Sequence, residues 1–194
     1  MEAKLKAYLD QFYADNCAHD AAQTERIACW RNLHPDSATL LALLVRAKQA
    51  RKVLEIGTSN GYATLWLADA VRDTGGLLHT LEIDKARQKV AKQHVDEAGF
   101  ADDVRIEVCD AGEFLRTYPK YYDVVLLDAD RSQYTAYWPD LQRLLAKPGS
   151  LLVVDNVLSH ANEVRDFITQ VEADKNFSST VLDIGSGLLL ATRA

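Results

Sequence analysis

Two carboxylates and one amide follow two apolar runs of the sequence, and together they form a set of hard oxygen ligands. Asp128 ends the run 122–127, and Asp155 and Asn156 end the run 150–154. If these runs are neighbouring parallel strands, the side chains lie about 5–8 Å apart, since such strands lie roughly 4.8 Å apart. Oxygen ligands suit Mg²⁺, with Ca²⁺ or Mn²⁺ as alternatives. The spacing predicts a divalent-cation site; the alternative is that Asp128 faces a cofactor while the other two cap a loop.

A glycine-punctuated turn at 57–61 lies between the apolar run 53–56 and a helical pattern. Strand, turn and helix in this order form the first unit of an open parallel α/β sheet, which binds ligands at the carboxyl ends of its strands. The turn differs from the dinucleotide fingerprint because Ser59 stands at the second glycine position. It does match the nucleophile elbow of serine hydrolases, and His160 follows in the chain order that such enzymes use. The turn alone leaves a cofactor cradle and a serine hydrolase open.

Acidic residues also close two further predicted strands. Glu82 stands near the end of the run 77–83, where a carboxylate can accept hydrogen bonds from both hydroxyls of a ribose; the alternative is a surface acid that caps the next helix. Asp110 follows the alternating run 103–108. Its carboxylate could accept a hydrogen bond from an adenine amino group, or it could only cap the helix that begins at Ala111.

Composition excludes several classes of protein. A chain of 194 residues with 48% hydrophobic residues is predicted to form one domain, 1–194, with a sizeable core. The formal net charge of −6 argues against a nucleic-acid partner. The three cysteines have no C-x-x-C spacing, which disfavours a disulfide framework or a zinc site. The N-terminus lacks signal-peptide order, and the longest apolar run, 40–45, is too short for a bilayer. We expect a cytoplasmic protein without a membrane partner.

The elements that must position these residues alternate along the chain. Five predicted strands are separated by helices, and the tail, 177–183 and 188–193, reads as an antiparallel hairpin. Residues 1–48 are predicted to be helical, with 20–30 as a second helix. An apolar stripe on the first helix either packs on its own domain or forms a dimer interface. Residues 49–194 are expected to be the cofactor-binding core, with 1–48 covering the substrate side or a dimer contact.

Taken together, these motifs resemble the class I S-adenosylmethionine-dependent, cation-dependent O-methyltransferases. That family includes catechol and caffeoyl-coenzyme A O-methyltransferases, and the small bacterial members are the most similar. The matching stretches are 53–62, 81–84, 110–111, 123–130 and 153–157. The resemblance implies a Rossmann-like α/β fold with a mostly parallel seven-stranded sheet, an antiparallel C-terminal strand and helices on both faces. The cofactor contacts that it implies are Glu55, Gly57, Ser59, Gly61, Glu82, Asp110, Ala111 and Asp128. The metal ligands that it implies are Asp128, Asp155 and Asn156.

The resemblance also implies a reaction: methyl transfer to a hydroxyl of a small, catechol-like aromatic diol chelated by the metal, in a homodimer. The expected catalytic residues are Asp128, Arg131 and His160. Arg131 departs from the family, which usually places a lysine there as the base. A guanidinium stays protonated, so Arg131 can steady a phenolate or a substrate carboxylate but cannot take a proton. Water, or His160, would have to accept it.

Two alternative functions remain open at this point. A serine hydrolase would use Ser59 with His160 and an aspartate between them in the chain. A non-catalytic S-adenosylmethionine-binding protein would keep the cofactor fold after losing its base at Arg131.

Overall fold

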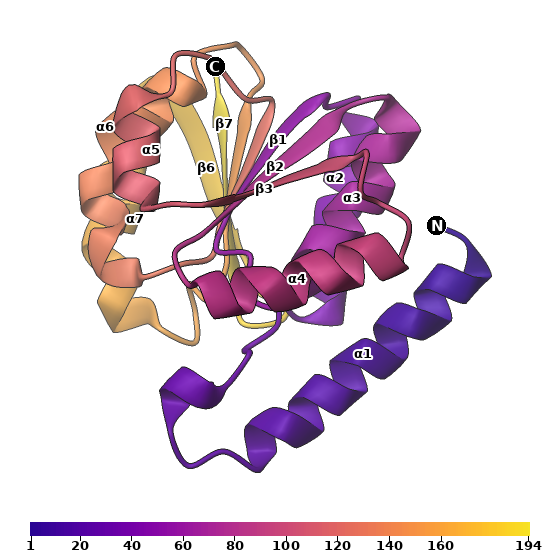
Figure 1. Cartoon of the computed structure of the whole chain (residues 1–194). Helices are drawn as coiled ribbons and strands as arrows, with labels where there is room; N and C mark the ends of the chain where they lie inside the picture. The colour runs from indigo at the N-terminus through magenta and orange to yellow at the C-terminus, as the bar shows by residue number, and fades with distance from the viewer.

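A seven-stranded β-sheet runs through the centre of the computed structural model, with helices on both faces (Figure 1). The structure describes the backbone of residues 1–194 and every side chain except that of Arg26. The strands are β1 (Lys52–Ile56), β2 (Leu77–Glu82), β3 (Val104–Val108), β4 (Val124–Leu127), β5 (Leu151–Val154), β6 (Phe177–Leu182) and β7 (Leu188–Arg193). The helices are α1 (Ala3–Ala21), η1 (Arg26–Ala28), α2 (Pro35–Ala47), α3 (Tyr62–Thr74), α4 (Lys85–Glu97), α5 (Ala111–Thr117), η2 (Arg131–Gln133), α6 (Tyr134–Leu144) and α7 (Ala161–Glu172).

The strand order is β3-β2-β1-β4-β5-β7-β6. The strands β1 to β5 are parallel, because β1 pairs with β2 and β4, β2 with β3, and β4 with β5 in that sense. The last strand, β7, runs antiparallel to both β5 and β6. The predicted Rossmann-like sheet with an antiparallel C-terminal strand is therefore confirmed.

Alternate residues of each central strand face opposite helical layers, as the two-residue period of a strand requires. In β4, Val124 and Leu126 join the core under α2 and α3, whereas Val125 and Leu127 join the core under α5, α6 and α7. All four side chains are fully buried. A strand covered on both faces must be apolar throughout, which explains the uninterrupted run of aliphatic residues.

The site-forming edge of the sheet follows from this topology. The chain leaves β1 for β2 on one side, and later returns to place β4 on the other. Loops that leave the carboxyl ends of β1 and β4 therefore diverge to opposite faces and open a crevice between them, which is where open α/β sheets bind ligands.

The N-terminal helix α1 lies along α4, on the helical layer that carries α3 (Figure 1). Leu9 and Phe12 of its apolar stripe are buried, and Tyr8 Oη hydrogen-bonds to His94 Nδ1 at 2.8 Å. This part of the stripe therefore packs on its own domain.

The helix expected at 20–30 is wrong. The helix α1 ends at Ala21, and the chain then turns back through the short η1. The carboxylate of Asp20 accepts hydrogen bonds from the backbone N–H groups of Trp30 and Arg31 at 2.7 and 2.8 Å. A side chain that captures amides ten residues away folds the segment into a loop instead of a helix.

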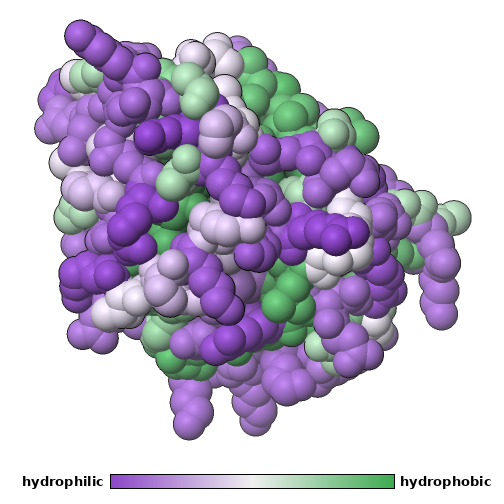
Figure 2. Space-filling model, turned by 90° about the horizontal axis from the view of Figure 1, so that it is seen from above, coloured by the Kyte–Doolittle hydropathy of each residue, from purple (hydrophilic) through white to green (hydrophobic). Residues whose placement is uncertain are grey.

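The surface is mixed. Figure 2 shows a face on which hydrophilic residues predominate and hydrophobic ones form small patches between them, as on most folded proteins. Among the described residues, no helix combines the length and apolar character needed to span a bilayer.

Two leucines of α2 test the packing. Leu41 is 1% exposed and lies in the core, whereas Leu43 on the same helix is 57% exposed. Leu41→Ala should lower the free energy of unfolding by about 2–5 kcal/mol, since it removes buried methyl groups and leaves a cavity. Leu43→Ala should change it by less than about 0.5 kcal/mol. Urea denaturation followed by circular dichroism measures both, and equal losses would contradict the placement of α2.

Candidate active site

A cavity of about 760 Å³ opens at the carboxyl ends of the parallel strands. The predicted site residues on its wall are Gly57, Ser59, Glu82, Asp110, Ala111, Asp128, Arg131, Asn156 and His160. Three others, Glu55, Gly61 and Asp155, are not on that wall, although Asp155 is in hydrogen-bond contact with Asn156. The strand ends therefore bring nine of the predicted residues to one cavity.

In the turn after β1, both the backbone conformation and the surrounding atoms restrict position 57 to glycine. Its φ is +103°, and a Cβ at this position would lie 2.0 Å from the carbonyl oxygen of Asp128. The turn therefore packs directly against the chain that leaves β4. Ser59 also has a left-handed φ of 50°, and Gly61, at φ 91°, precedes the first residue of α3. The α3 N-terminus and the backbone of the turn thus face the cavity side of the sheet.

Glu82 fixes the turn to the end of β2. Its Oε2 accepts from the Ser59 N–H at 2.8 Å, and its Oε1 accepts from the Asp84 N–H at 2.9 Å. Each carboxylate oxygen keeps a further lone pair, so the group can also accept from hydroxyls in the cavity. Asp110 is the N-cap of α5, with Oδ1 accepting from the Glu113 N–H at 2.8 Å. The capping alternative is therefore realised at Asp110, while the side chain also lines the cavity.

Glu55 occupies a different layer from the one expected. Its carboxylate is fully buried, and Oε2 accepts from the hydroxyls of Thr64 and Thr80 at 2.6 Å each. Burial, aided by the negative charges of Asp128 and Glu82, raises the pKa of Glu55 to about 8. Among the described side chains, Oε1 has no hydrogen-bond partner. Glu55 supports the turn from beneath, and it does not reach the cavity wall.

The three groups predicted to hold a cation come together. The strands β4 and β5 are hydrogen-bonded neighbours, and Asn156 Nδ2 donates to Asp155 Oδ2 at 2.8 Å and to Asp128 Oδ1 at 3.2 Å. Asn156 has a φ of +66°, in the left-handed region that asparagine tolerates better than most other non-glycine residues. The amide thus bridges two carboxylates that would otherwise face each other directly.

Both carboxylates are costly to ionise where they lie. Burial raises the pKa of Asp128 to about 6, against the lowering effect of the Arg31 and Arg131 charges. Burial, and then the charge of Asp128, raises the pKa of Asp155 to about 7. Two desolvated acids in contact are stabilised by a nearby cation.

The donor set suits a hard cation. Asp155 Oδ1 is buried and has no partner among the described side chains, so one oxygen is unsatisfied at the centre of the group. No cluster of three or more His, Cys, Asp or Glu side chains suited to a metal exists among the described residues. The group here has two carboxylates and one amide. The amide presents Nδ2 to both carboxylates, so it would have to turn its Oδ1 toward them to complete an oxygen set of the kind that Mg²⁺ and Ca²⁺ accept.

Arg131 and His160 flank this group. Arg131 Nε donates to Glu163 Oε2 at 2.8 Å, and its side chain is 10% exposed. The backbone N–H of His160 donates to the Asn156 carbonyl at 3.0 Å, and its Nδ1 pairs with Ser159 Oγ at 2.9 Å. Both side chains therefore belong to the same end of the cavity as the two carboxylates.

The serine hydrolase alternative is wrong. Ser59 Oγ donates to the Trp30 carbonyl at 3.0 Å and accepts from Arg87 Nη1 at 3.1 Å. His160 hydrogen-bonds to Ser159 instead. A nucleophilic serine needs a histidine within hydrogen-bond reach of its oxygen, and Ser59 is instead committed to holding a loop.

The sequence analysis missed that loop. Ile27, Trp30 and Arg31 line the cavity. Arg87 holds them by donating to the carbonyls of Ile27 and Cys29 at 2.6 and 2.9 Å, with its guanidinium 5.2 Å from the Trp30 ring. These are contacts between segments some sixty residues apart in sequence, and no local pattern signals them.

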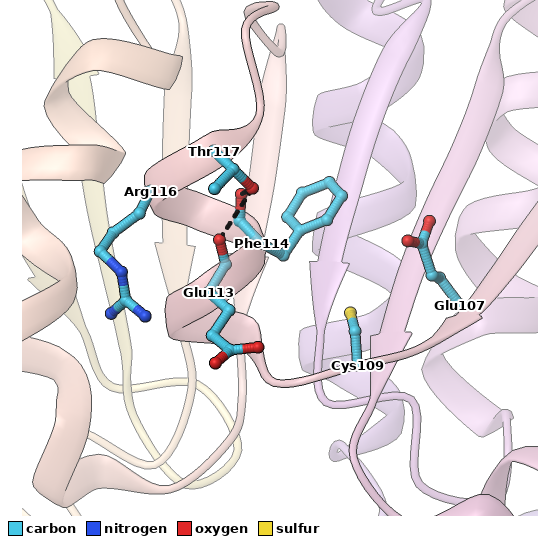
Figure 3. A pocket seen from close by; sticks show the side chains of 6 residues that line it. All are labelled: Glu107, Cys109, Glu113, Phe114, Arg116 and Thr117. Atoms are coloured by element: carbon cyan, nitrogen blue, oxygen red, sulfur yellow. Dashed lines mark hydrogen bonds between the residues drawn. The ribbon is translucent and has the colours of Figure 1, made fainter.

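A second, more open cavity of about 420 Å³ lies beside the first, between β3 and α5 (Figure 3). Cys109 lies on the walls of both cavities, near Glu107 and Phe114. Burial, and then nearby acidic charges, raise the pKa of its thiol to about 11. The thiol stays protonated at neutral pH, so it is a poor nucleophile.

Comparisons with known proteins agree with this geometry. The O-methyltransferase family model matches residues 6–194. The chain belongs to the O-methyltransferase family. It is 36% identical over 131 residues to the catechol O-methyltransferase of Niastella koreensis, and this match covers 66% of the present chain and 58% of that protein. It is 39% identical over 145 residues to the catechol O-methyltransferase of Mycobacterium tuberculosis, covering 73% and 62%. The matches thus span less than two thirds of either relative.

A solved structure extends the likeness to the whole fold. The O-methyltransferase of Bacillus cereus in complex with SAH, the demethylated form of S-adenosylmethionine, superposes with a TM-score of 0.82 at 25% identity. The match covers 100% of the present chain and 92% of the Bacillus cereus chain.

A comparison of two glycines separates two effects on stability: the close approach of the turn to Asp128, and the cost of a left-handed backbone conformation. Gly57 and Gly99 both have positive φ, but a Cβ at Gly99 would meet nothing within 4 Å. Gly99→Ala should cost about 1–2 kcal/mol of unfolding free energy, the penalty of the left-handed conformation. Gly57→Ala should cost more, about 3 kcal/mol or above, because the turn must also move away from Asp128. Denaturant titration of the two variants decides this, and equal costs would contradict the packing of the turn.

Glu55 should make stability depend on pH. Between the ordinary carboxyl pKa and about 8, the unfolded chain ionises while the folded protein keeps the proton. Stability from this group is therefore lost as the pH rises, with a slope on the order of 1 kcal/mol per pH unit. In Glu55→Gln the unfolding free energy relative to wild type should increase from pH 5 to pH 8. Parallel pH profiles for the two proteins in urea would show that Glu55 is ionised in the fold.

Proposed function

We propose that the protein transfers the methyl group of S-adenosylmethionine to one hydroxyl of a small aromatic acceptor with two adjacent oxygens. The observation that carries this proposal is the single cavity in which the turn after β1 adjoins Asp128, Asn156 and, behind them, Asp155. The relatives named catechol O-methyltransferase support a catechol-like acceptor. The SAH-bound neighbour supports the donor.

The donor would be held by the wall that β1, β2 and β3 contribute. The turn at Gly57 and Ser59 would adjoin the methionine part, although the N–H groups of these two residues already donate to the Leu81 carbonyl and to Glu82. Glu82 would accept from the ribose hydroxyls, and Asp110 and Ala111 would border the adenine. Because Glu82 is already fixed by two backbone N–H groups, it is pre-organised, and little conformational freedom is lost on binding.

Asp128, Asp155 and Asn156 would hold a divalent cation, Mg²⁺ in preference to Ca²⁺ or Mn²⁺. When bound, such a cation acts as a Lewis acid that lowers the pKa of an acceptor hydroxyl and orients its oxygen. The chain's own contribution is to fix Asp128 and Asn156 on the cavity wall with Asp155 beside them, and to exclude water from Asp155, which is 3% exposed.

In the transfer, the acceptor oxygen forms a bond to the methyl carbon as the bond from that carbon to sulfur breaks, leaving a neutral thioether. Arg131 keeps its proton throughout, so it can stabilise negative charge on the acceptor, a phenolate or a carboxylate, but takes no proton. The hydroxyl proton goes to water or to His160, which lines the same cavity. Much of the rate comes from holding donor and acceptor in line.

Residues 1–48 are proposed to cover the substrate side of the core formed by 49–194, since Ile27, Trp30 and Arg31 line the cavity. A homodimer and a cytoplasmic location remain predictions from the sequence. Light scattering on the purified protein measures the first.

The second candidate function is binding of S-adenosylmethionine without turnover, and the arginine at position 131 favours it. Calorimetric titration with the donor, followed by assays on catechol-like acceptors, separates the two. Binding with transfer supports the enzyme, binding without transfer supports the second candidate, and the absence of binding contradicts both.

The cation site can be tested at Asp155. Asp155→Ala should lower methyl transfer by about 100-fold or more, because a metal ligand is lost, while affinity for S-adenosylmethionine stays within about twofold. Chelation by EDTA should inactivate the wild type, and Mg²⁺ should restore it. A thermal shift of the wild type by Mg²⁺ should be absent in the variant.

The exposed Asp166→Ala is the matched control and should behave like the wild type in all three measurements. Chelator-resistant activity, or a Mg²⁺ shift that survives in Asp155→Ala, would contradict the proposed ligands.

A further inference from the structure

The cavity wall carries charges of both signs. Its acids are Glu82, Asp84, Asp110, Asp128 and Asp130, and its arginines are Arg31, Arg87 and Arg131. Arg87 is committed to the carbonyls of Ile27 and Cys29. The chain as a whole has a formal net charge of −6, so arginines gathered on one cavity wall are a local feature, and a ligand that enters the cavity meets fixed positive charge.

Arg131 is held in place on this wall. Its side chain is only 10% exposed, and the ion pair from Nε to Glu163 Oε2 at 2.8 Å orients the guanidinium plane. A guanidinium has five N–H donors in a planar fork, and its two terminal NH₂ groups match the two oxygens of a carboxylate. An arginine held at Nε is therefore suited to bind a carboxylate ligand with its terminal groups.

Arg31 is placed by its backbone. Its φ is +55°, a left-handed conformation that an arginine seldom adopts. The Asp20 carboxylate stabilises that conformation by accepting from the N–H groups of Trp30 and Arg31 at 2.7 and 2.8 Å. Arg87 and Ser59 hold the same loop from the other side through the carbonyls of Ile27, Cys29 and Trp30. The loop is thus built to bring Arg31 to the cavity.

Arg31 and Arg131 line the same cavity as Asp128 and Asn156. Arg31 comes from the N-terminal segment, whereas the other three follow β4 and β5, so the cavity brings together parts of the chain that are far apart in sequence.

Resting on the proposed function, we infer that the acceptor is an aromatic diol that bears a carboxylate, and that Arg31 and Arg131 bind this carboxylate while the diol oxygens face Asp128 and Asn156. Arg31 is then a residue that determines specificity. In this protein, Arg131 would select the substrate, whereas the lysine that the family usually has at this position would act as the base.

The experiment compares 3,4-dihydroxybenzoate with its methyl ester and its amide, which have the same diol but no charge on the substituent. With S-adenosylmethionine and Mg²⁺, kcat/KM should favour the acid by about tenfold or more, as a charge-assisted bidentate contact predicts. Arg31→Gln should lower kcat/KM for the acid by about tenfold and change the value for the ester by less than about twofold. Arg31→Lys should retain part of the preference, because it keeps the charge without the fork.

The exposed Arg165→Gln is the control and should leave both substrates unchanged. Equal use of acid and ester by the wild type, or equal losses for both in Arg31→Gln, would overturn the inference while leaving methyl transfer standing. If no diol is methylated, calorimetry measures binding of 3,4-dihydroxybenzoate to the SAH-loaded protein. Binding that is lost in Arg31→Gln would support the carboxylate site and contradict the proposed methyl transfer. Absence of such binding overturns both.

Discussion

The parallel pairing of β4 with β5 is the constraint on which the rest of the structure depends. In that register Leu127 lies opposite Val154, so the next residues, Asp128 and Asp155, leave the sheet side by side. The strands are apolar on both faces and exclude water, which makes two adjacent carboxylates expensive to ionise. The Asn156 amide offsets part of that cost by donating to both. A divalent cation would offset the remainder.

The turn at 57–61, which would hold the donor, and the group formed by Asp128 and Asp155 are parts of one rigid unit. The turn at Gly57 approaches the Asp128 carbonyl so closely that no side chain fits between them. Glu82 ties the same turn to β2 through Ser59. Because the sheet fixes both contacts, a bound donor and the acid group would keep a constant separation, which is what in-line transfer between them needs. The loop that carries Arg31 comes from outside the sheet, and selection of the acceptor would reside there.

Much of this arrangement could be predicted from sequence, because it depends on local rules. Apolar runs give buried strands, and acids at strand ends meet at one edge of a parallel sheet. The cofactor contact expected at Glu55 does not follow from its position, because alternation along β1 directs its side chain toward Thr64 of α3 and away from the cavity wall, a consequence that the two-residue period does contain. The helical pattern at 20–30 fails as a predictor, since the shape of this segment depends on Asp20, Ser59 and Arg87. Those contacts join residues far apart in sequence, so local propensity does not predict them.

The most direct measurement is the position of a divalent ion in a crystal of the protein grown with SAH and Mn²⁺, located by anomalous scattering. The proposed function predicts one strong peak within about 2.0–2.3 Å of oxygens from Asp128, Asp155 and Asn156, beside the sulfur of the bound SAH. A peak elsewhere, or SAH bound with no ion between those three side chains, would contradict the central claim.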